Sequence, residues 1–433
     1  VGHAEEPGTI VVEIVSAETK RPLGDIIVTV TPRDGSPTVV RTSSDGTATV
    51  EQLNPGLYAL RAEAPAFVTS FEPRIRVVAR RATPLRIELL AQDSTLDEVV
   101  VVARALQADT DGPITNAYVN REELRSAVGA GSDVMRALDG LPGLVSTGDF
   151  ANFSVRGRGP RDNLIFVDGI PLDKVVHFDQ TLGEEEDIGG GGRFSIFAPN
   201  SIAGAEFSPG GWSAAYGGRS GSLLQLDVAG GSPTPSASLR VDIAGFELGY
   251  EGPSGFHDDT TVFLTARNFD FGRVFEQIGE NDIGRPELSD FILKTVTEID
   301  ARNNLEVLAI LAPEEYRRDI DNVLESPDFE DVALLNSEQD LGLLGVSWKR
   351  LVGDRGEWVN RVYVRSSDKT SSEGEAFPDL VPIGTPAANI PVNERLITIN
   401  EDETEIGWRS DYATQNRWGK VSAGLRVSQI DLA

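Results

Sequence analysis

Alternation of apolar and polar positions dominates the chain from about residue 232 onward. In Ser238 to Ile243 and Phe246 to Tyr250 every second residue is apolar, and Gly, Pro and acidic residues separate such runs. A two-residue period predicts β-strands with one apolar face. It is typical of a transmembrane β-barrel, and a soluble β-sandwich is the alternative. Further predicted strands are Thr260 to Phe271, Phe291 to Ile299, Leu305 to Leu311, Leu341 to Leu351, Trp358 to Ser367, Thr404 to Tyr412 and Trp418 to Leu432.

A second group of short strands is predicted between residue 8 and about residue 91. The strands are Thr9 to Val15, Ile26 to Thr31, Thr47 to Val50, Leu57 to Ala62 and Leu85 to Leu89. This spacing predicts a β-sandwich of about seven strands or fewer. The motifs in Thr19 to Val30, Thr42 to Ala48 and Leu53 to Leu60 resemble the carboxypeptidase regulatory-like domain. No catalysis follows from that resemblance, because the segment lacks the grouped His and Glu residues of a zinc peptidase.

Two glycine-rich runs lie between these regions. The first, SVRGRGPRDNLIFVDGIPL from Ser154 to Leu172, predicts two strands and a turn at Asp168-Gly169. The second, PNSIAGAEFSPGGWSAAYGGRSGSLLQLDV from Pro199 to Val228, leads through a glycine-rich loop into a strand at Ser222 to Val228. Glycine tolerates positive φ and lets another segment approach the backbone closely.

In their order and spacing, the two runs resemble the plug domain of the TonB-dependent outer-membrane transporters. The resemblance assigns plug motifs to Arg156, Gly157, Asp168, Gly169, Tyr216, Gly217, Gly218 and Arg219. We interpret Arg156 and Arg219 as candidate ties between plug and barrel wall, because a guanidinium can hold a carboxylate through two hydrogen bonds. Bonding to carbonyl groups within the plug is the alternative for both arginines.

The segment between the N-terminal strands and the plug is similar to a TonB box in that family. It consists of Leu96, Asp97, Glu98, Val99, Val100, Val101, Val102 and Ala103. The resemblance implies that an inner-membrane energy-coupling protein pulls on this segment. An extended β-branched run suits strand addition to the sheet edge of a partner. Four consecutive valines are also typical of a buried strand, and it is the position before the plug that favours the TonB box.

The expected fold is mainly β with an α/β plug. Residues 1–91 form the carboxypeptidase regulatory-like β-sandwich, 92–107 the linker with the TonB box, 108–231 the plug, and 232–433 the first strands of an outer-membrane β-barrel. A helix is expected over Arg121 to Leu138, with Asn120 as N-cap. Large plugged barrels have about 22 strands, and at ~9–11 residues each the last segment supplies about eight to ten. We therefore expect the N-terminal portion of a longer, processed protein.

Several aromatic and acidic residues have two possible roles. The run Glu184, Glu185, Glu186 and Asp187 suits a hard cation, but it lacks the alternating ligands of a calcium loop, which favours a solvated acidic loop. Phe178, Phe194 and Phe197 are either plug core or ligand contacts, and core is favoured. Candidates for interfacial aromatic girdles are Tyr250, Phe263, Trp348, Tyr363, Trp408 and Trp418.

Composition restricts the possible chemistry. The formal net charge is −29, from 68 acidic and 39 basic residues, which argues against nucleic acid as a partner. The chain has no cysteine and three scattered histidines, one of which is His177, so no histidine metal cluster is expected. No nucleophile or metal motif occurs. We therefore expect no catalytic residues, no cofactor and no enzyme activity, and a surface hydrolase is disfavoured.

The resemblance implies an outer-membrane transporter or receptor with a periplasmic N-terminal domain. It would import a nutrient, either an oligomeric glycan or peptide or an iron chelate, and its partners would be a TonB-type inner-membrane protein and outer-membrane lipid. A surface lipoprotein or another outer-membrane subunit is a further candidate partner. The alternative is a structural or assembly scaffold that retains the transporter architecture, and accessibility of the TonB box would separate the two hypotheses.

Overall fold

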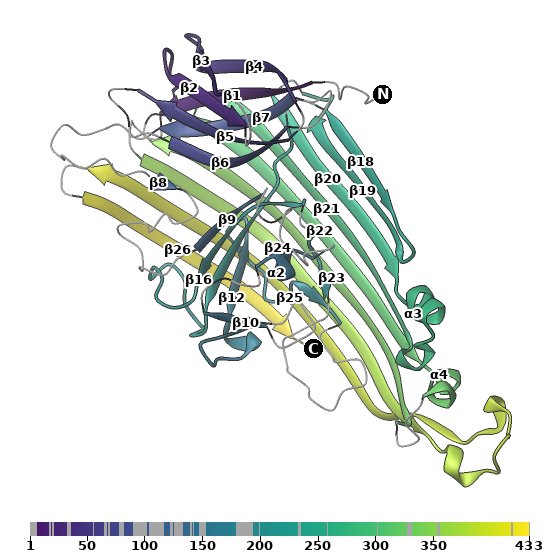
Figure 1. The fold of residues 1–433 in the computed structure, drawn as a ribbon. Helices are drawn as coiled ribbons and strands as arrows, with labels where there is room; N and C mark the ends of the chain where they lie inside the picture. The colour runs from purple at the N-terminus through teal and green to yellow at the C-terminus, as the bar shows by residue number, and fades with distance from the viewer. Residues whose placement is uncertain are drawn as a thin grey trace, which may run out of the picture.

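The protein is organised in three β-rich parts (Figure 1). The computed structural model describes residues 7–16, 19, 21–32, 36–54, 56–64, 67, 70–77, 82–89, 102–103, 117–121, 124, 133–138, 141, 143–146, 153–178, 194–198, 200–232, 235–257, 259–300, 302–326, 331–352, 356–416 and 419–432. A small N-terminal unit comes first, followed by a central unit and a large antiparallel sheet. We call the central unit, residues 117–228, the plug, and the large sheet the wall.

The N-terminal unit is the β-sandwich expected from the sequence. One sheet has the order β4 (Thr47–Leu53), β1 (Gly8–Ser16), β7 (Ala82–Leu89). The other has the order β3 (Thr38–Arg41), β2 (Ile27–Pro32), β5 (Gly56–Glu63), β6 (Ser70–Val77), β8 (Val102–Ala103). Alternate side chains of β1 are fully buried and pack against Val28, Val30 and Leu60 of the second sheet. Strands β3 and β6 were not predicted; β6 contains Pro73 and two arginines, which hide its strand pattern.

The plug is built on a five-stranded mixed sheet. Its order is β13 (Ile170–Pro171), β12 (Leu164–Val167), β17 (Leu223–Val228), β16 (Ile202–Ser208), β9 (Ala117–Asn120), with β12 and β17 parallel. Two antiparallel ribbons accompany the sheet: β10 (Leu144–Ser146) with β11 (Phe153–Val155), and β14 (Val176–His177) with β15 (Phe194–Ser195). The described helices are the 3-10 turn η2 (Pro160–Asp162) and α2 (Val134–Ala137), which lies within the helix expected over Arg121 to Leu138.

The wall is a sheet of nine antiparallel strands that pair in sequence order. They are β18 (Ser236–Val241), β19 (Gly245–Pro253), β20 (Thr260–Asp270), β21 (Arg285–Asp300), β22 (Asn303–Arg318), β23 (Ala333–Val352), β24 (Gly356–Ala376), β25 (Val392–Asn416) and β26 (Gly419–Leu432). Every strand predicted after residue 232 is present, and most extend further than the apolar alternation indicated. The alternation marks only the part with one apolar face, whereas backbone pairing with long neighbours continues beyond it.

The two ends of the wall differ in their connections. At one end lie α3 (Gly272–Ile278), η3 (Asn281–Ile283), α4 (Ile320–Glu325), η4 (Pro378–Leu380) and η5 (Ala387–Asn389). Figure 1 shows α3 and α4 at the end of the sheet away from the N-terminal unit. Among the described residues, no helix is long and apolar enough to cross a membrane.

Plug and wall share one apolar core. Plug residues Val167, Ile170 and Phe197 belong to the same buried cluster as wall residues Ile292 and Leu343. Phe178 and Phe197 are buried and Phe194 packs beside Phe178, so these three aromatic rings lie in packed clusters. The opposite face of the wall exposes large apolar side chains at alternating positions, among them Leu344, Val346, Val362, Ile406, Trp408, Leu425 and Val427.

Two of the aromatic girdle assignments are wrong. Phe263 and Tyr363 are 3% and 2% exposed and belong to the core shared with the plug, so they cannot lie at a lipid interface. Neighbouring residues of a strand point to opposite faces of the sheet, and an aromatic ring can lie on either face, so the sequence alone does not show which face it occupies. Trp408 does lie on the exposed face, and Trp418 falls outside the described residues.

Candidate functional site at the plug and wall

The Asp168-Gly169 turn is the point at which the plug meets the charged part of the wall. It joins β12 to β13 as a two-residue hairpin loop, and both residues have positive φ, 50° and 77°. An Asp-Gly pair suits such a turn because Asp tolerates and Gly readily adopts this backbone conformation. The Asp168 carboxylate accepts a hydrogen bond of 3.1 Å from the backbone N–H of Val228, which fixes the turn against β17.

Three cations of the wall converge on this turn. Lys294 Nζ of β21 lies 2.9 Å from Asp168 Oδ1 and also donates to the carbonyl of Val228 at 2.9 Å. Arg361 of β24 donates from Nε to the Asp168 carbonyl at 2.9 Å, and Arg409 of β25 donates to the Gly169 carbonyl at 3.4 Å. The plug turn therefore binds the wall through one side chain and two main-chain carbonyls.

Acidic residues of the wall balance these cations. Asp411 Oδ2 accepts from Arg361 at 2.9 Å and from Arg409 at 2.7 Å, which holds the two guanidinium groups side by side. Glu306 lies 3.8 Å from Lys294 and 2.6 Å from Lys349. Buried charges are tolerated when they are paired in this way, and removing one partner leaves the other uncompensated.

Tyr216 of the second glycine-rich run packs beside the same turn. The Arg409 guanidinium lies over its ring, 4.8 Å from the centroid, and the ring meets Phe166 edge-on at 4.9 Å. The Tyr216 hydroxyl lies 2.6 Å from Gln225 Oε1 in β17. A cation above an aromatic face is attracted by the ring quadrupole, so Tyr216 gives Arg409 a second contact with the plug.

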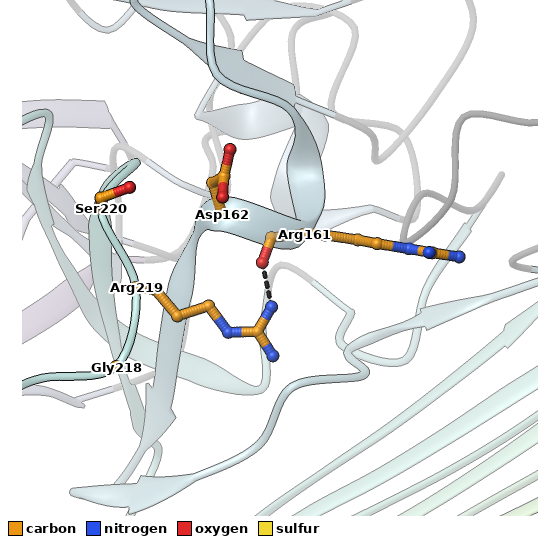
Figure 2. Close-up of a pocket in the computed structure, with 5 residues that line it drawn as sticks. All are labelled: Arg161, Asp162, Gly218, Arg219 and Ser220. Atoms are coloured by element: carbon orange, nitrogen blue, oxygen red, sulfur yellow. Dashed lines mark hydrogen bonds between the residues drawn. The ribbon is translucent and has the colours of Figure 1, made fainter.

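Arg219 bonds mainly within the plug. Its guanidinium donates to the carbonyl of Arg161, as Figure 2 shows, and it lies 3.6 Å from Asp173. Asp173 in turn lies 3.3 Å from Arg365 of β24, so the link from Arg219 to the wall runs through Asp173. A surface depression of about 540 Å³ adjoins this group and is lined by Arg161, Asp162, Gly218, Arg219 and Ser220.

Arg156 and Gly157 form another turn with positive φ, 50° and 79°. The Arg156 backbone N–H donates to the Gly143 carbonyl at 3.3 Å, and its side chain is exposed. The contacts of the Arg219 guanidinium therefore match the alternative of bonding inside the plug, whereas the Arg156 contact is made by its backbone and the role of its side chain stays a prediction. Among the plug-motif residues, the direct ties to the wall come from Asp168, Gly169 and Tyr216.

Two predicted segments lie outside the described residues: Leu96 to Val101 of the predicted TonB box, and the acidic run Glu184 to Asp187. The last two residues of the box, Val102 and Ala103, form strand β8. This strand pairs in parallel with β6 of the N-terminal unit, with Val102 opposite Ser70 and Ala103 opposite Phe71. This end of the segment is thus extended and already engaged in strand pairing.

Sequence reasoning did not identify Lys294, Arg361 and Arg409. Each lies inside a correctly predicted strand, but the predicted ties between plug and wall were confined to the glycine-rich motifs. A signal was present in Phe291 to Val296, FILKTV, because Lys294 interrupts a strongly apolar run. A lysine at an inward position of a barrel strand indicates a partner inside the barrel.

A plug tied by buried charges to one face of a long antiparallel sheet is the arrangement expected of part of a plugged outer-membrane barrel. Family models agree: residues 107–222 match the TonB-dependent receptor plug domain, and residues 9–90 match the carboxypeptidase regulatory-like domain. The chain therefore carries a plug domain of the TonB-dependent receptor type, preceded by a carboxypeptidase regulatory-like domain. It is an outer-membrane protein whose N-terminal domain faces the periplasm.

Comparison with known proteins shows similarity in sequence and in fold to transporters and receptors of this kind. The chain is 29% identical over 174 residues to the TonB-dependent transporter Oar of Myxococcus xanthus, a match that covers 38% of this chain and 16% of Oar. The siderophore receptor PirA of Acinetobacter baumannii has a similar fold, with a TM-score of 0.52 at 12% identity over 77% of this chain and 50% of PirA. The ferric enterobactin receptor PfeA of Pseudomonas aeruginosa gives 0.51 at 13% identity over 77% and 51%. The chain thus spans about half the length of these receptors.

Proposed function

We propose that the protein is a TonB-dependent active transporter that imports a nutrient into the periplasm, and that it has no enzyme activity. The observation that carries this proposal is the buried contact of the Asp168 turn with Lys294, Arg361 and Arg409. A plug held in this way blocks the barrel. Separating these pairs leaves buried charges without their partners until water reaches them, so opening a path requires work supplied from outside the barrel.

The segment Leu96 to Ala103 is suited to receive that work. It precedes the plug, and its β-branched residues favour strand addition to a partner such as a TonB-type inner-membrane protein. The end of the segment, β8, is able to pair as a strand, and its partner within the chain is β6. The imported solute is an oligomeric glycan or peptide or an iron chelate. The carboxypeptidase regulatory-like domain favours the oligomers, whereas the receptors PirA and PfeA are named for siderophores.

The test is capture of a purified TonB C-terminal domain by the full-length protein, with and without extract of the native growth medium. Val100→Pro removes a main-chain donor from the centre of the segment and should abolish capture. Gln92→Pro lies in the same linker outside the segment and serves as the matched control. Capture that increases with extract and is lost only in Val100→Pro supports energised import. Equal capture by both variants, or none under any condition, contradicts it and favours a scaffold.

A further inference from the structure

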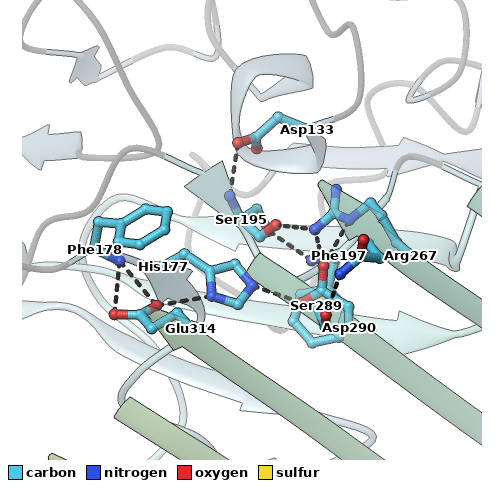
Figure 3. A network of polar contacts seen from close by, with 10 residues as sticks. Asp133, His177, Phe178, Ser195, Phe197, Arg267, Ser289, Asp290 and Glu314 are labelled. Atoms are coloured by element: carbon cyan, nitrogen blue, oxygen red, sulfur yellow. Dashed lines mark hydrogen bonds and ion pairs between the residues drawn. The ribbon is translucent and has the colours of Figure 1, made fainter. Parts of the chain in front are cut away.

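A second contact between plug and wall centres on His177 and does not involve the plug motifs. The ribbon of β14 and β15 pairs Val176 with Ser195 and His177 with Phe194. His177 is 1% exposed, and the carboxylates that face it, Asp290 of β21 and Glu314 of β22, are 3% and 5% exposed (Figure 3). The imidazole of the plug therefore lies between two neighbouring strands of the wall, away from solvent.

Both ring nitrogens of His177 contact a carboxylate. Nε2 lies 2.6 Å from Asp290 Oδ1, and Nδ1 lies 2.8 Å from Glu314 Oε2. A neutral imidazole carries one N–H, so it can donate to only one of these oxygens, whereas the imidazolium donates to both. With both carboxyls ionised, only the protonated form satisfies this geometry. Burial alone would lower the pKa of His177, but the charges of Asp290 and Glu314 raise it to about 9.

The other strand of the ribbon, β15, is held by Arg267 and Asp133. Arg267 of β20 donates from Nε to Asp290 Oδ2 at 2.6 Å and from a terminal nitrogen to the Ser195 carbonyl at 2.6 Å. Asp133, which precedes α2, accepts from the Ser195 backbone N–H at 2.7 Å. The two strands of the ribbon are therefore bonded to three strands of the wall and to the start of a plug helix.

The backbone after His177 is strained where it meets the wall. Phe178 has a φ of 56°, a left-handed conformation that is costly for a bulky residue. Its N–H donates to both oxygens of Glu314, at 3.1 and 3.0 Å, and its ring packs edge-on against Tyr316 of β22. Glu314 thus binds the imidazolium and the strained backbone at once, so loss of the His177 proton disturbs both contacts.

The charges of His177, Arg267, Asp290 and Glu314 sum to zero only when His177 is protonated. We propose that His177 is a proton-dependent positioning residue that clamps the β14–β15 ribbon of the plug to strands β20 to β22 of the wall. Loss of its proton removes the hydrogen bond from the imidazole to one of the two buried carboxylates and leaves the group with a net negative charge, which weakens the clamp. The plug is then held at the Asp168 turn and released at the ribbon. The clamp does not depend on whether the protein imports a nutrient.

The protonation state can be measured directly. The protein has three histidines, so ¹⁵N-histidine NMR of the full-length protein in detergent gives few ring signals, which His3→Gln and His257→Gln variants assign by elimination. We expect both His177 nitrogens to carry protons at about pH 7 and one of them to lose its proton at about pH 9. A neutral His177 ring at about pH 7 overturns the proposal, and this result needs no variant at His177.

The effect on the plug is measured with a single thiol. The sequence has no cysteine, so Val176→Cys places a unique buried probe beside His177. Its labelling rate, divided by the rate in denaturant at the same pH, reports exposure of the ribbon. With His177 intact, we expect this ratio to rise about tenfold between about pH 8 and pH 10. His177→Gln should raise the ratio already at about pH 7 and remove the pH step, and His257→Gln should leave the step unchanged.

Glu314→Gln provides a variant with a milder change. A glutamine amide can donate to a neutral imidazole, so the ring no longer needs two protons, and the step in labelling should move to lower pH. A step at the same pH in this variant contradicts the clamp. A step of unchanged size in His177→Gln contradicts it as well. Neither outcome bears on capture of a TonB domain, so the clamp and the proposed function fail independently.

Discussion

Lys294 of the wall and Asp168 of the plug are 126 residues apart in sequence, and their side chains meet at 2.9 Å while being only 8% and 7% exposed. Asp168 is the plug-motif residue of the Asp168-Gly169 turn. Its partner, Lys294, belongs to the wall, so this motif residue bonds to a different part of the protein. Because water does not screen these charges, each side chain depends strongly on the other.

Replacing the lysine should therefore destabilise the plug. Lys294→Met leaves Asp168 buried without its cation, and we expect a loss of about 3–5 kcal/mol in the free energy of unfolding. Denaturant titration of the full-length protein measures this loss. Arg317→Met breaks the exposed pair with Glu315 and should cost about 0–1 kcal/mol. In Lys294→Met with Asp168→Asn, the loss should be smaller than the sum of the single losses; strict additivity would show that the pair is not coupled.

Gly169 should tolerate a side chain less well than Gly157. The two residues have nearly the same φ, 77° and 79°, so alanine is strained to a similar degree at both. A Cβ at Gly169 would lie 2.7 Å from the Arg361 guanidinium, whereas a Cβ at Gly157 meets nothing within 4 Å. We expect Gly169→Ala to cost about 1–3 kcal/mol more than Gly157→Ala in thermal or denaturant unfolding. Equal losses would mean that Arg361 does not press on the turn.

The two contacts of Tyr216 can be removed one at a time. Tyr216→Phe deletes the hydrogen bond to Gln225 and should cost about 1 kcal/mol. Tyr216→Leu also removes the ring beneath Arg409, which should add about 0.5–2 kcal/mol. The comparison uses denaturant midpoints of the two variants. If Tyr216→Leu is no worse than Tyr216→Phe, the cation over the ring contributes nothing to stability.

Stability should fall at alkaline pH because of His177. Its pKa in the folded protein is about 9, above the ordinary value of 6.5, so the proton binds the folded state more tightly. The stabilisation is complete below about pH 6.5, declines between about pH 6.5 and pH 9, and is lost above pH 9. Unfolding free energies measured across this range should decrease in the wild type and stay flatter in His177→Gln. Parallel curves would assign the alkaline loss to other groups.

Most strands could be predicted because the alternation of apolar and polar residues is visible within each strand. Alternation identified every wall strand, and the Asp-Gly turn followed from two adjacent residues. The contacts of Lys294, Arg361 and Arg409 could not be predicted in the same way, because they depend on strand register and on how the plug sits within the wall. The misassigned Phe263 and Tyr363 have the same cause: an aromatic residue in an alternating strand does not itself show which face is inside.

The strands are long at the end of the wall that carries α3 and α4, away from the N-terminal unit, and this length has a mechanical consequence. β25 runs for 25 residues, whereas about 9–11 tilted residues suffice to cross the bilayer. At about 3.3 Å per residue, the surplus raises the β24–β25 hairpin by roughly 30 Å or more above the lipid. The rim on this side is therefore tall, and under the proposed function a solute would first contact the protein well outside the membrane.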